Sequence, residues 1–202
     1  MPIEIEKKYR LTGRQRSQLL RKLETVGAIR QSEEFEENTL YSGKGIDARS
    51  AVLRLRRAGD RTTLTYKKRF PSRSSIKHQL EEETEVADAE ALDLILRALG
   101  YKAALVYEKR RLTWTIDETE VVIDELPFGQ FMEIEGSETD IAKVERKLGA
   151  AGFEAELETY PALTRVHGTA NGDVIEARFA RSSGRSNRRA SANEKTGLPS
   201  QL

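Results

Sequence analysis

Charged and apolar residues alternate along seven short stretches of this chain, and this two-residue period limits the possible folds more than any other feature. The first stretch is IEIEKKYRL, in which Glu4, Glu6 and Lys8 take every second position. Successive side chains of a β-strand point to opposite faces, so these three residues share one face. The stretches VLRLRR, LTYKKR, LEEETEV, EKRRLTWT, VVIDEL and FMEIEG repeat the pattern, which predicts strands with one charged and one largely apolar face.

Three other stretches place their apolar residues at helical spacing. They are TGRQRSQLLRKLETVGA, DAEALDLILRALG and SETDIAKVERKLGAAG, each with a glycine at or near its end. Asp88 and Ser137 are suitable N-caps for the second and third of these helices. Ala58, Gly59 and Asp60 separate two strand-like stretches and predict a hairpin turn. About seven or eight strands with inserted helices predict an α+β fold with a largely antiparallel sheet.

The charges on the strand faces are sorted by sign. Carboxylates dominate the first, fifth and last predicted strands, whereas Lys and Arg dominate the third, fourth and sixth. A sheet with one face in water would be expected to mix the two signs. If the sheet closes with the charged faces inward, an acidic wall faces a basic wall. Clustered cations bind phosphate oxygens, and clustered carboxylates bind a hard cation such as Mg²⁺ or Mn²⁺, so the pattern favours a polyphosphate ligand with its metal.

Composition narrows the functional class. The 202 residues suffice for one sizeable domain and an appendage. With 34 basic and 33 acidic residues the net charge is +1, which predicts neither a nucleic-acid nor a membrane partner. The absence of cysteine excludes disulfides, thiolate metal sites and a cysteine nucleophile, and favours a cytoplasmic protein. The sequence contains no uncharged apolar run of about 18 residues, so it predicts no membrane-spanning helix.

The composition changes at Gly168, after which Gly, Ser, Asn and Arg predominate and apolar periodicity is weak. This change predicts a disordered, mildly basic tail over residues 168–202, following a folded domain that spans residues 1–167. A solubilising end is the simplest interpretation of such a tail, with weak association to an anionic surface as the alternative.

Several of these motifs also occur, in the same order, in a known family. IEIEKK, LRLR, TYKKR, EEETEV, EKRR, VIDELPFGQFMEIEG and TYPALT resemble the CYTH superfamily of triphosphate tunnel metalloenzymes, over residues 2–166. Its members include class IV adenylate cyclases, thiamine triphosphatases and inorganic triphosphatases. The resemblance implies a closed, eight-stranded antiparallel tunnel flanked by helices, with a small-molecule triphosphate and Mg²⁺ or Mn²⁺ bound inside.

The expected site residues lie on the charged faces of the predicted strands. We expect catalytic roles for Glu4, Glu6, Lys8, Glu133 and Glu135. We expect substrate binding by Lys8, Arg54, Arg56, Lys67, Arg69, Glu83, Glu85, Lys109 and Arg111. We expect metal binding by Glu4, Glu6, Asp124, Glu133 and Glu135. Two alternatives stay open: Glu83 and Glu85 would either bind directly or orient a cation across the tunnel, and Arg69 would be a solvated charge at a strand end.

The sequence departs from the family pattern at two motifs. Ser42 stands where many relatives have Asp, and the closing motif, often Ser-Tyr, is Thr159-Tyr160. The cyclases of the family carry a His-Phe pair before the first strand, for which Met1 and Pro2 leave no room. We therefore expect a metal-dependent phosphohydrolase acting on inorganic triphosphate, thiamine triphosphate or a nucleoside triphosphate. The alternative is a class IV adenylate cyclase, which converts ATP to cyclic AMP and pyrophosphate in a lumen of the same kind.

A non-enzymatic alternative is a module that binds polyphosphate or an RNA 5'-triphosphate. Such a module would need the basic wall but not the carboxylates, so their presence argues against it. The sequence contains no P-loop, Rossmann fingerprint, HExxH motif or nucleophile elbow. We expect a monomer or a homodimer.

Overall fold

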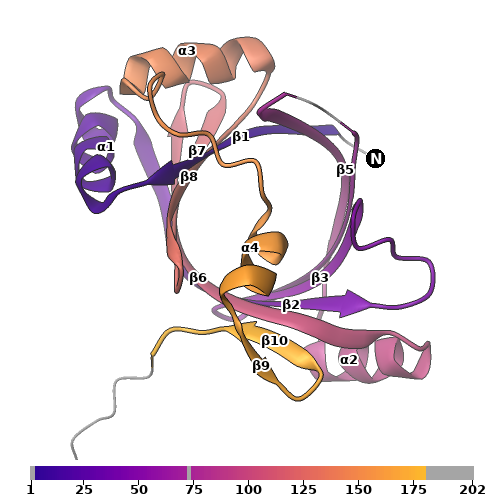
Figure 1. Cartoon of the computed structure of the whole chain (residues 1–202). Helices are drawn as coiled ribbons and strands as arrows, with labels where there is room; N and C mark the ends of the chain where they lie inside the picture. The colour runs from indigo at the N-terminus through magenta and orange to yellow at the C-terminus, as the bar shows by residue number, and fades with distance from the viewer. Residues whose placement is uncertain (1–2, 72–73, 181–202) are drawn as a thin grey trace, which may run out of the picture.

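Eight antiparallel strands form a closed barrel in the computed structural model, which describes residues 3–71 and 74–180 (Figure 1). The strands are β1 (Ile3–Leu11), β2 (Ile29–Ser42), β3 (Ala51–Ala58), β4 (Arg61–Arg69), β5 (Ile76–Glu85), β6 (Lys102–Ile116), β7 (Thr119–Leu126) and β8 (Gly129–Glu135). The barrel closes where β2 pairs with β6, from Ile29 opposite Thr115 to Ser42 opposite Lys102. The predicted α+β fold and its closed eight-stranded tunnel are confirmed.

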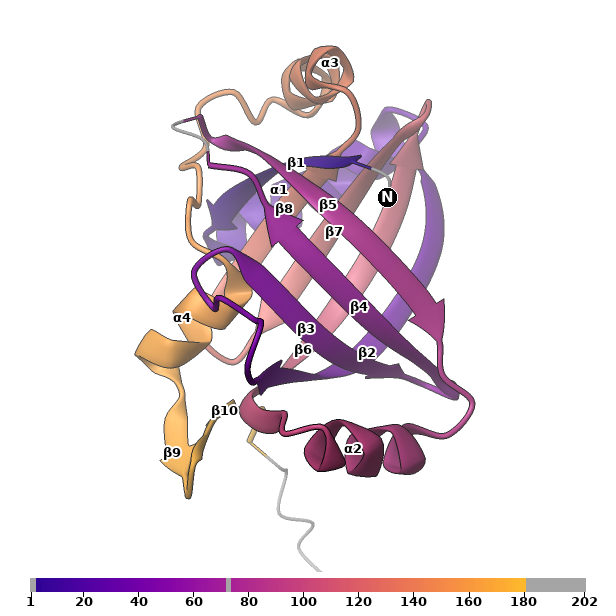
Figure 2. The ribbon, with the colours of Figure 1, turned by 90° about the vertical axis from the view of Figure 1, so that its right-hand side faces the viewer.

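The order of the strands around the barrel explains how charges of one sign come together. That order is β2-β3-β4-β5-β1-β8-β7-β6, and β6 returns to β2. The acid-rich strands β5, β1 and β8 are therefore consecutive, and the basic strands β3 and β4 lie next to each other (Figure 2). The third basic strand, β6, lies between β7 and β2 and forms a second basic strip.

Four helices in the described chain flank the barrel: α1 (Gly13–Thr25), α2 (Ala89–Ala98), α3 (Glu138–Leu148) and α4 (Tyr160–His167). The first three match the predicted helices, and each begins after a side chain that accepts hydrogen bonds from first-turn N–H groups, namely Thr12, Asp88 and Ser137. In Figure 1, α1 and α3 cover one side of the barrel and α2 the opposite side. None of the described helices is both long enough and apolar enough to cross a membrane.

The apolar core lies on the outer side of the barrel wall, under these helices. Leu19 and Leu23 of α1 pack with Ile141 of α3 and Tyr9 of β1 in the largest buried cluster. Separate clusters lie under α2 and beside α4. Because the apolar faces of the strands are buried by helices, the opposite faces are free to fill the interior with charged groups.

The chain after residue 158 contains structure that the sequence did not predict. Helix α4 follows the capping residue Thr159 and has Pro161 in its first turn, where proline is well tolerated. Strands β9 (Thr169–Asn171) and β10 (Val174–Ala177) form a hairpin, and β10 pairs in parallel with β6. Residues 169–171 and 174–177 thus differ from the predicted disordered tail, because apolar burial at Ala177 and backbone pairing order them. Residues 181–202 of that predicted tail lie outside the described residues.

Candidate active site

A cavity of about 300 Å³ lies inside the barrel, a volume at the lower end of the range for small-molecule sites. Nine Lys and Arg side chains and five Glu side chains line it, an excess of four positive charges. The predicted site residues that line it are Glu4, Glu6, Lys8, Arg54, Arg56, Lys67, Arg69, Lys109, Arg111, Glu133 and Glu135. The start of α4 forms part of the wall. The structure thus brings most of the predicted site together around one space suited to a small polyanion.

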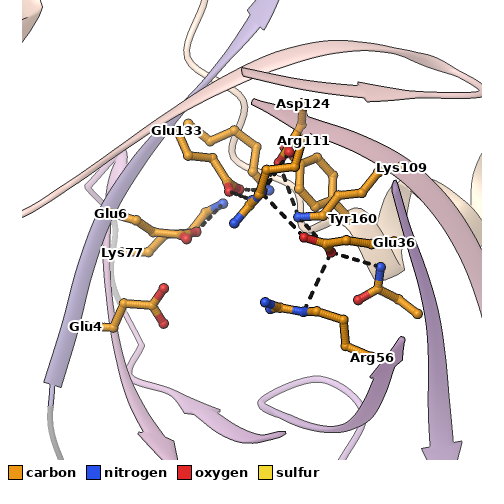
Figure 3. A network of polar contacts seen from close by, with 12 residues as sticks. Glu4, Glu6, Glu36, Arg56, Lys77, Lys109, Arg111, Asp124, Glu133 and Tyr160 are labelled. Atoms are coloured by element: carbon orange, nitrogen blue, oxygen red, sulfur yellow. Dashed lines mark hydrogen bonds and ion pairs between the residues drawn. The ribbon is translucent and has the colours of Figure 1, made fainter. Parts of the chain in front are cut away.

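Arg111 is the most firmly anchored cation of this cavity (Figure 3). It donates two hydrogen bonds to Asp124, of 2.8 Å from Nε and 2.6 Å from Nη2, and Nη2 also donates to Glu133 at 2.8 Å. Asp124 is fully buried, does not line the cavity, and accepts a further hydrogen bond of 2.9 Å from the Tyr160 hydroxyl. This geometry favours a role for Asp124 in orienting Arg111 over the predicted role as a metal ligand.

Lys8 and Glu133 form the adjoining part of the cavity wall. They face each other across β1 and β8, and Lys8 Nζ lies 3.2 Å from Glu133 Oε1. Lys8 Nζ also lies 3.7 Å from the ring centre of Tyr160, a cation–π contact. Burial alone would raise the pKa of Glu133, but Lys8 and Arg111 hold it well below the usual value. Glu133 is therefore charged at neutral pH.

On the acidic side of the cavity, one lysine forms ion pairs with two carboxylates. Lys67 Nζ lies 2.7 Å from both Glu4 Oε2 and Glu81 Oε2. Glu4 also accepts a hydrogen bond of 2.8 Å from Gln79. Burial and the neighbouring Glu81 raise the pKa of Glu4, while Lys67 acts in the opposite direction. On this side of the cavity, Lys67 alone does not neutralise the two carboxylates of Glu4 and Glu81.

Glu135 is the carboxylate on which this deficit has the largest effect. It stands opposite Glu6 of β1 and opposite Glu120 of β7. Burial, followed by the charges of Glu4 and Glu120, raises the pKa of Glu135 to about 8. An added cation on this side would lower that pKa and remove the mutual repulsion.

Among the arginines that line the cavity, Arg54 and Arg69 each have a buried Nε without a hydrogen-bond partner among the described residues, and the Nε of Arg56 has only the carboxylate of Glu36 nearby, at 3.6 Å. Arg54 Nη2 donates to Thr65 Oγ1 at 3.2 Å. A buried donor without an acceptor costs about 1–3 kcal/mol. All three side chains line the cavity, so oxygens of a bound anion would satisfy donors that the protein leaves open.

The two remaining predicted residues lie beyond the cavity. Glu83 accepts a hydrogen bond of 2.7 Å from Thr65 and lies 3.8 Å from Arg54, so it contacts a cavity arginine from behind. Glu85, further along β5, is exposed. Neither residue lines the cavity.

Comparisons with known proteins agree with this geometry. The sequence profile of the CYTH domain matches residues 2–158. The chain belongs to the CYTH domain family. Members of this family bind triphosphate substrates and include triphosphatases and adenylate cyclases. No curated protein sequence matches the chain.

Solved structures with the same CYTH fold cover nearly all of this domain. Protein PH1012 of Pyrococcus horikoshii has a TM-score of 0.70 and 26% identity, over 79% of this chain and 98% of that chain. A candidate adenylate cyclase from Vibrio parahaemolyticus has a TM-score of 0.62 and 18% identity, over 80% and 97%. A candidate adenylyl cyclase from Hippeastrum, described by its dominant triphosphatase activity, has a TM-score of 0.63 and 16% identity, over 82% and 96%.

CYTH domains are generally metal-dependent, so the residues of this cavity should be able to hold a divalent ion. Within residues 3–71 and 74–180, no three Asp, Glu, His or Cys side chains form a ready-made metal site. Mg²⁺ commonly uses only one or two carboxylates and completes its shell with water and substrate phosphate oxygens. Glu4, Glu6 and Glu135 line the cavity from neighbouring strands, and burial and neighbouring carboxylates raise the pKa of Glu4 and of Glu135. These residues fit an ion that is shared with a bound phosphate.

Sequence analysis missed several charged residues of this CYTH barrel, of which Glu36 and Lys77 are the most deeply buried. Glu36 is 1% exposed and lies within ion-pair distance of Arg56, Lys109 and Arg111. Lys77 Nζ is 3.5 Å from Glu6, and burial, followed by the charge of Lys8, lowers the pKa of Lys77 to about 8. A signal for Glu36 was present, because Glu34, Glu36 and Asn38 alternate along β2.

Proposed function

We propose that this CYTH domain is a metal-dependent triphosphatase, which hydrolyses a triphosphate bound in the 300 Å³ cavity. The observation that carries this proposal is the set of buried guanidinium nitrogens on cavity-lining side chains that lack an acceptor, at Arg54 and Arg69. Phosphate oxygens are the acceptors that guanidinium groups bind best. The same cavity carries an excess of four positive charges, which favours a polyanion over a neutral substrate.

The charged residues of the cavity divide into cations, which would bind phosphate, and carboxylates, which would bind a metal ion. Arg54, Arg56, Lys67, Lys109 and Arg111, together with Lys8, would bind and align the phosphate oxygens. Arg111 is held on two sides by Asp124 and Glu133, so its position does not depend on substrate. Positioned cations stabilise the charge that spreads over the equatorial oxygens during phosphoryl transfer.

Glu4 and Glu6, with Glu133 and Glu135 beside them, would hold Mg²⁺ or Mn²⁺, which supplies charge neutralisation and a more acidic bound water. In the hydrolysis, a water oxygen forms a bond to the terminal phosphorus and the bond from that phosphorus to the bridging oxygen breaks. Orthophosphate forms, the rest of the substrate leaves with the bridging oxygen as pyrophosphate, thiamine diphosphate or a nucleoside diphosphate, and one water proton is released. The contribution of the protein is alignment and charge stabilisation.

Two alternatives share the same cavity. The candidate cyclases among the structural neighbours favour attack by the ribose 3'-hydroxyl of ATP on the α-phosphorus, which yields cyclic AMP and pyrophosphate. The dominant triphosphatase activity stated for the Hippeastrum protein favours hydrolysis. The second alternative, a module that only binds polyphosphate or RNA 5'-triphosphate, would have no use for Glu4, Glu6 and Glu135 at the cavity wall.

The test is a substrate panel of inorganic triphosphate, thiamine triphosphate and ATP with Mg²⁺ or Mn²⁺. Free phosphate, pyrophosphate and cyclic AMP are measured for each. We expect orthophosphate to be released from at least one substrate, and Glu4→Gln and Glu133→Gln to lose most of this activity. Release of cyclic AMP from ATP without orthophosphate would establish the cyclase instead, and binding without turnover would establish the module.

A further inference from the structure

A second cavity, of about 310 Å³, adjoins the first inside the barrel. Arg56 and Arg111 line both cavities, and thus stand at the boundary between them. The second cavity is otherwise lined by Ser32, Glu34, Glu36, Arg61, Thr113 and Glu120. Apart from the two shared arginines it has one cation and three carboxylates, whereas the first cavity has an excess of positive charge. The sign of the wall charge therefore reverses at the boundary.

Glu36 lies at the boundary between the two cavities, beside Arg56 and Arg111 (Figure 3). Its Oε2 is 3.6 Å from Arg56 Nε and 3.4 Å from Lys109 Nζ, and its Oε1 is 3.9 Å from Arg111 Nε. It lines the second cavity and not the first, so it contacts these cations from the side away from the proposed triphosphate. Burial alone would raise the pKa of Glu36, but Lys109 and Arg111 hold it well below the usual value, and the carboxylate stays charged.

We propose that Glu36 is a specificity-determining residue that stops the end of a phosphate chain at Arg56 and Arg111. The stop fixes which phosphorus atom is attacked. This inference rests on the proposed function and adds to it a residue that sets how deep the substrate enters. In the wild-type protein, only the terminal phosphate reaches the two shared arginines.

The physical reason is repulsion by the buried carboxylate of Glu36, since Glu34, Arg61 and Glu120 are more exposed to solvent and better screened. A phosphate group that passes Arg56 and Arg111 would meet the buried carboxylate of Glu36 and then Glu34 and Glu120, with Arg61 as the single remaining cation. Like charges placed against each other in a desolvated site cost enough to exclude a wrong partner. Removal of the Glu36 charge would leave Arg56 and Lys109 free to attract a phosphate further into the barrel.

Linear tetraphosphate distinguishes the two depths of entry. Cleavage at its terminal phosphorus, with water as the second reactant, gives orthophosphate and triphosphate, whereas cleavage of its central bridge gives two pyrophosphates. We expect the wild-type protein to give initially orthophosphate and triphosphate. We expect Glu36→Gln to produce pyrophosphate directly from tetraphosphate, with at least about a tenfold higher share of central cleavage.

Two variants serve as matched controls. Glu36→Asp keeps the charge and should keep the wild-type product pattern. Glu37→Gln removes the next carboxylate along β2, which pairs with Arg57 and Arg178 and lines neither cavity, and should also keep that pattern. The inference is wrong if Glu36→Gln gives the wild-type products, or if Glu36→Asp changes them as much as Glu36→Gln does.

A binding measurement separates failure of the inference from failure of the proposed function. Tripolyphosphate and tetraphosphate are titrated calorimetrically into metal-free protein. We expect Glu36→Gln to increase the affinity for tetraphosphate relative to tripolyphosphate by about tenfold, because the fourth phosphate gains access to the second cavity. Absence of hydrolysis of every substrate would refute the triphosphatase, while an unchanged affinity ratio would refute the stop.

Discussion

At the scale of single residues, Arg110 and Arg111 show how neighbours in sequence acquire different roles. Arg111 points into the barrel, where Asp124 and Glu133 accept its hydrogen bonds. Arg110 points outward, pairs with Glu125 at 3.4 Å and stacks 4.1 Å from the ring centre of Phe179. The alternation of a strand is the sole cause of this difference, since both residues belong to β6.

Arg111→Lys should therefore lower kcat/KM much more than Arg110→Lys. Lysine cannot reproduce the two parallel hydrogen bonds to Asp124, so the charge near the phosphate would lose its fixed position. We expect a loss of about 100-fold for Arg111→Lys, the size typical for removal of one preorganised donor. Steady-state kinetics on the triphosphate hydrolysed best measures both variants. Equal, small effects of the two substitutions would contradict the placement of Arg111 at the substrate.

Glu135 predicts a pH dependence of stability. Its pKa is about 8 in the folded protein and near 4.5 in the unfolded chain. Between these values the folded protein binds the proton more tightly, so the free energy of unfolding falls as the pH rises from about 4.5 to about 8. Glu135→Gln has no proton to lose at this position, so its free energy of unfolding does not fall in this way. The difference in free energy of unfolding between Glu135→Gln and wild type should therefore rise from about pH 4.5 to about pH 8 in favour of the variant, and should stay constant above about pH 8.

Urea unfolding of metal-free wild type and Glu135→Gln at about pH 5, 7 and 9 measures this gain. Glu118→Gln, at the exposed turn before β7, is the matched variant without the burial. A difference between wild type and Glu135→Gln that stays constant with pH would mean that Glu135 titrates normally.

At the scale of elements, the segment after residue 158 completes the cavity although the CYTH profile ends there. Helix α4 contributes Tyr160, and β10 holds the following chain against β6. Arg178 then pairs with Glu37 at 2.5 Å and with Glu108 at 3.0 Å, which fastens this segment to β2 and β6. The position of Tyr160 beside Asp124 thus depends on contacts well outside the cavity.

Gly168, between α4 and β9, is the tightest point of this segment. A Cβ at this residue would lie 2.6 Å from the Thr164 carbonyl oxygen and 2.8 Å from that of Glu176. Gly168→Ala should therefore displace α4 from β10 and reduce the free energy of unfolding by about 1–3 kcal/mol. Gly152→Ala is the matched substitution, because a Cβ there meets nothing within 4 Å. Chemical denaturation of both variants measures the difference, and similar midpoints would contradict the tight packing.

The elements differed in how much of their structure could be predicted from sequence. The alternation in β1, β3, β4 and β8 identified both the strands and their lumen residues, because a period of two fixes which face each side chain occupies. Helix α4 was missed because eight residues carry too little periodicity for a prediction. Glu36 was missed because both faces of β2 carry carboxylates, with Glu37 directly after Glu36, so the alternation does not show which face is the lumen face. Strand β10 depends on pairing with β6, a tertiary contact that local sequence does not encode.

At the scale of the whole molecule, the net charge of +1 conceals a strong separation of charge. The lining of the first cavity has four more cations than carboxylates, and carboxylates behind that lining, among them Glu36 and Asp124, offset part of this charge. The fold therefore keeps cationic groups at the cavity surface that a bound polyanion would neutralise.

Tripolyphosphate should accordingly stabilise the metal-free protein. We expect an increase of about 2.7 kcal/mol in the free energy of unfolding at a concentration 100 times the Kd. Thermal unfolding with tripolyphosphate, compared with sodium chloride at the same ionic strength, measures the effect. An equal shift in Tm from both salts would mean that general screening, and not the cavity, is responsible.

The pairing that closes the barrel also determines when the protein can acquire its native topology. Strand β2 ends at residue 42 and its partner β6 begins at residue 102, so this seam joins segments that are far apart along the polypeptide. A nascent chain cannot form the seam until β6 has left the ribosome, and the entropy of closing so long a loop slows the step. Until then, the free edges of the partial sheet β2-β3-β4-β5-β1 are β2 and β1, which remain open to pairing with other molecules, so dilute, cool conditions should favour correct refolding.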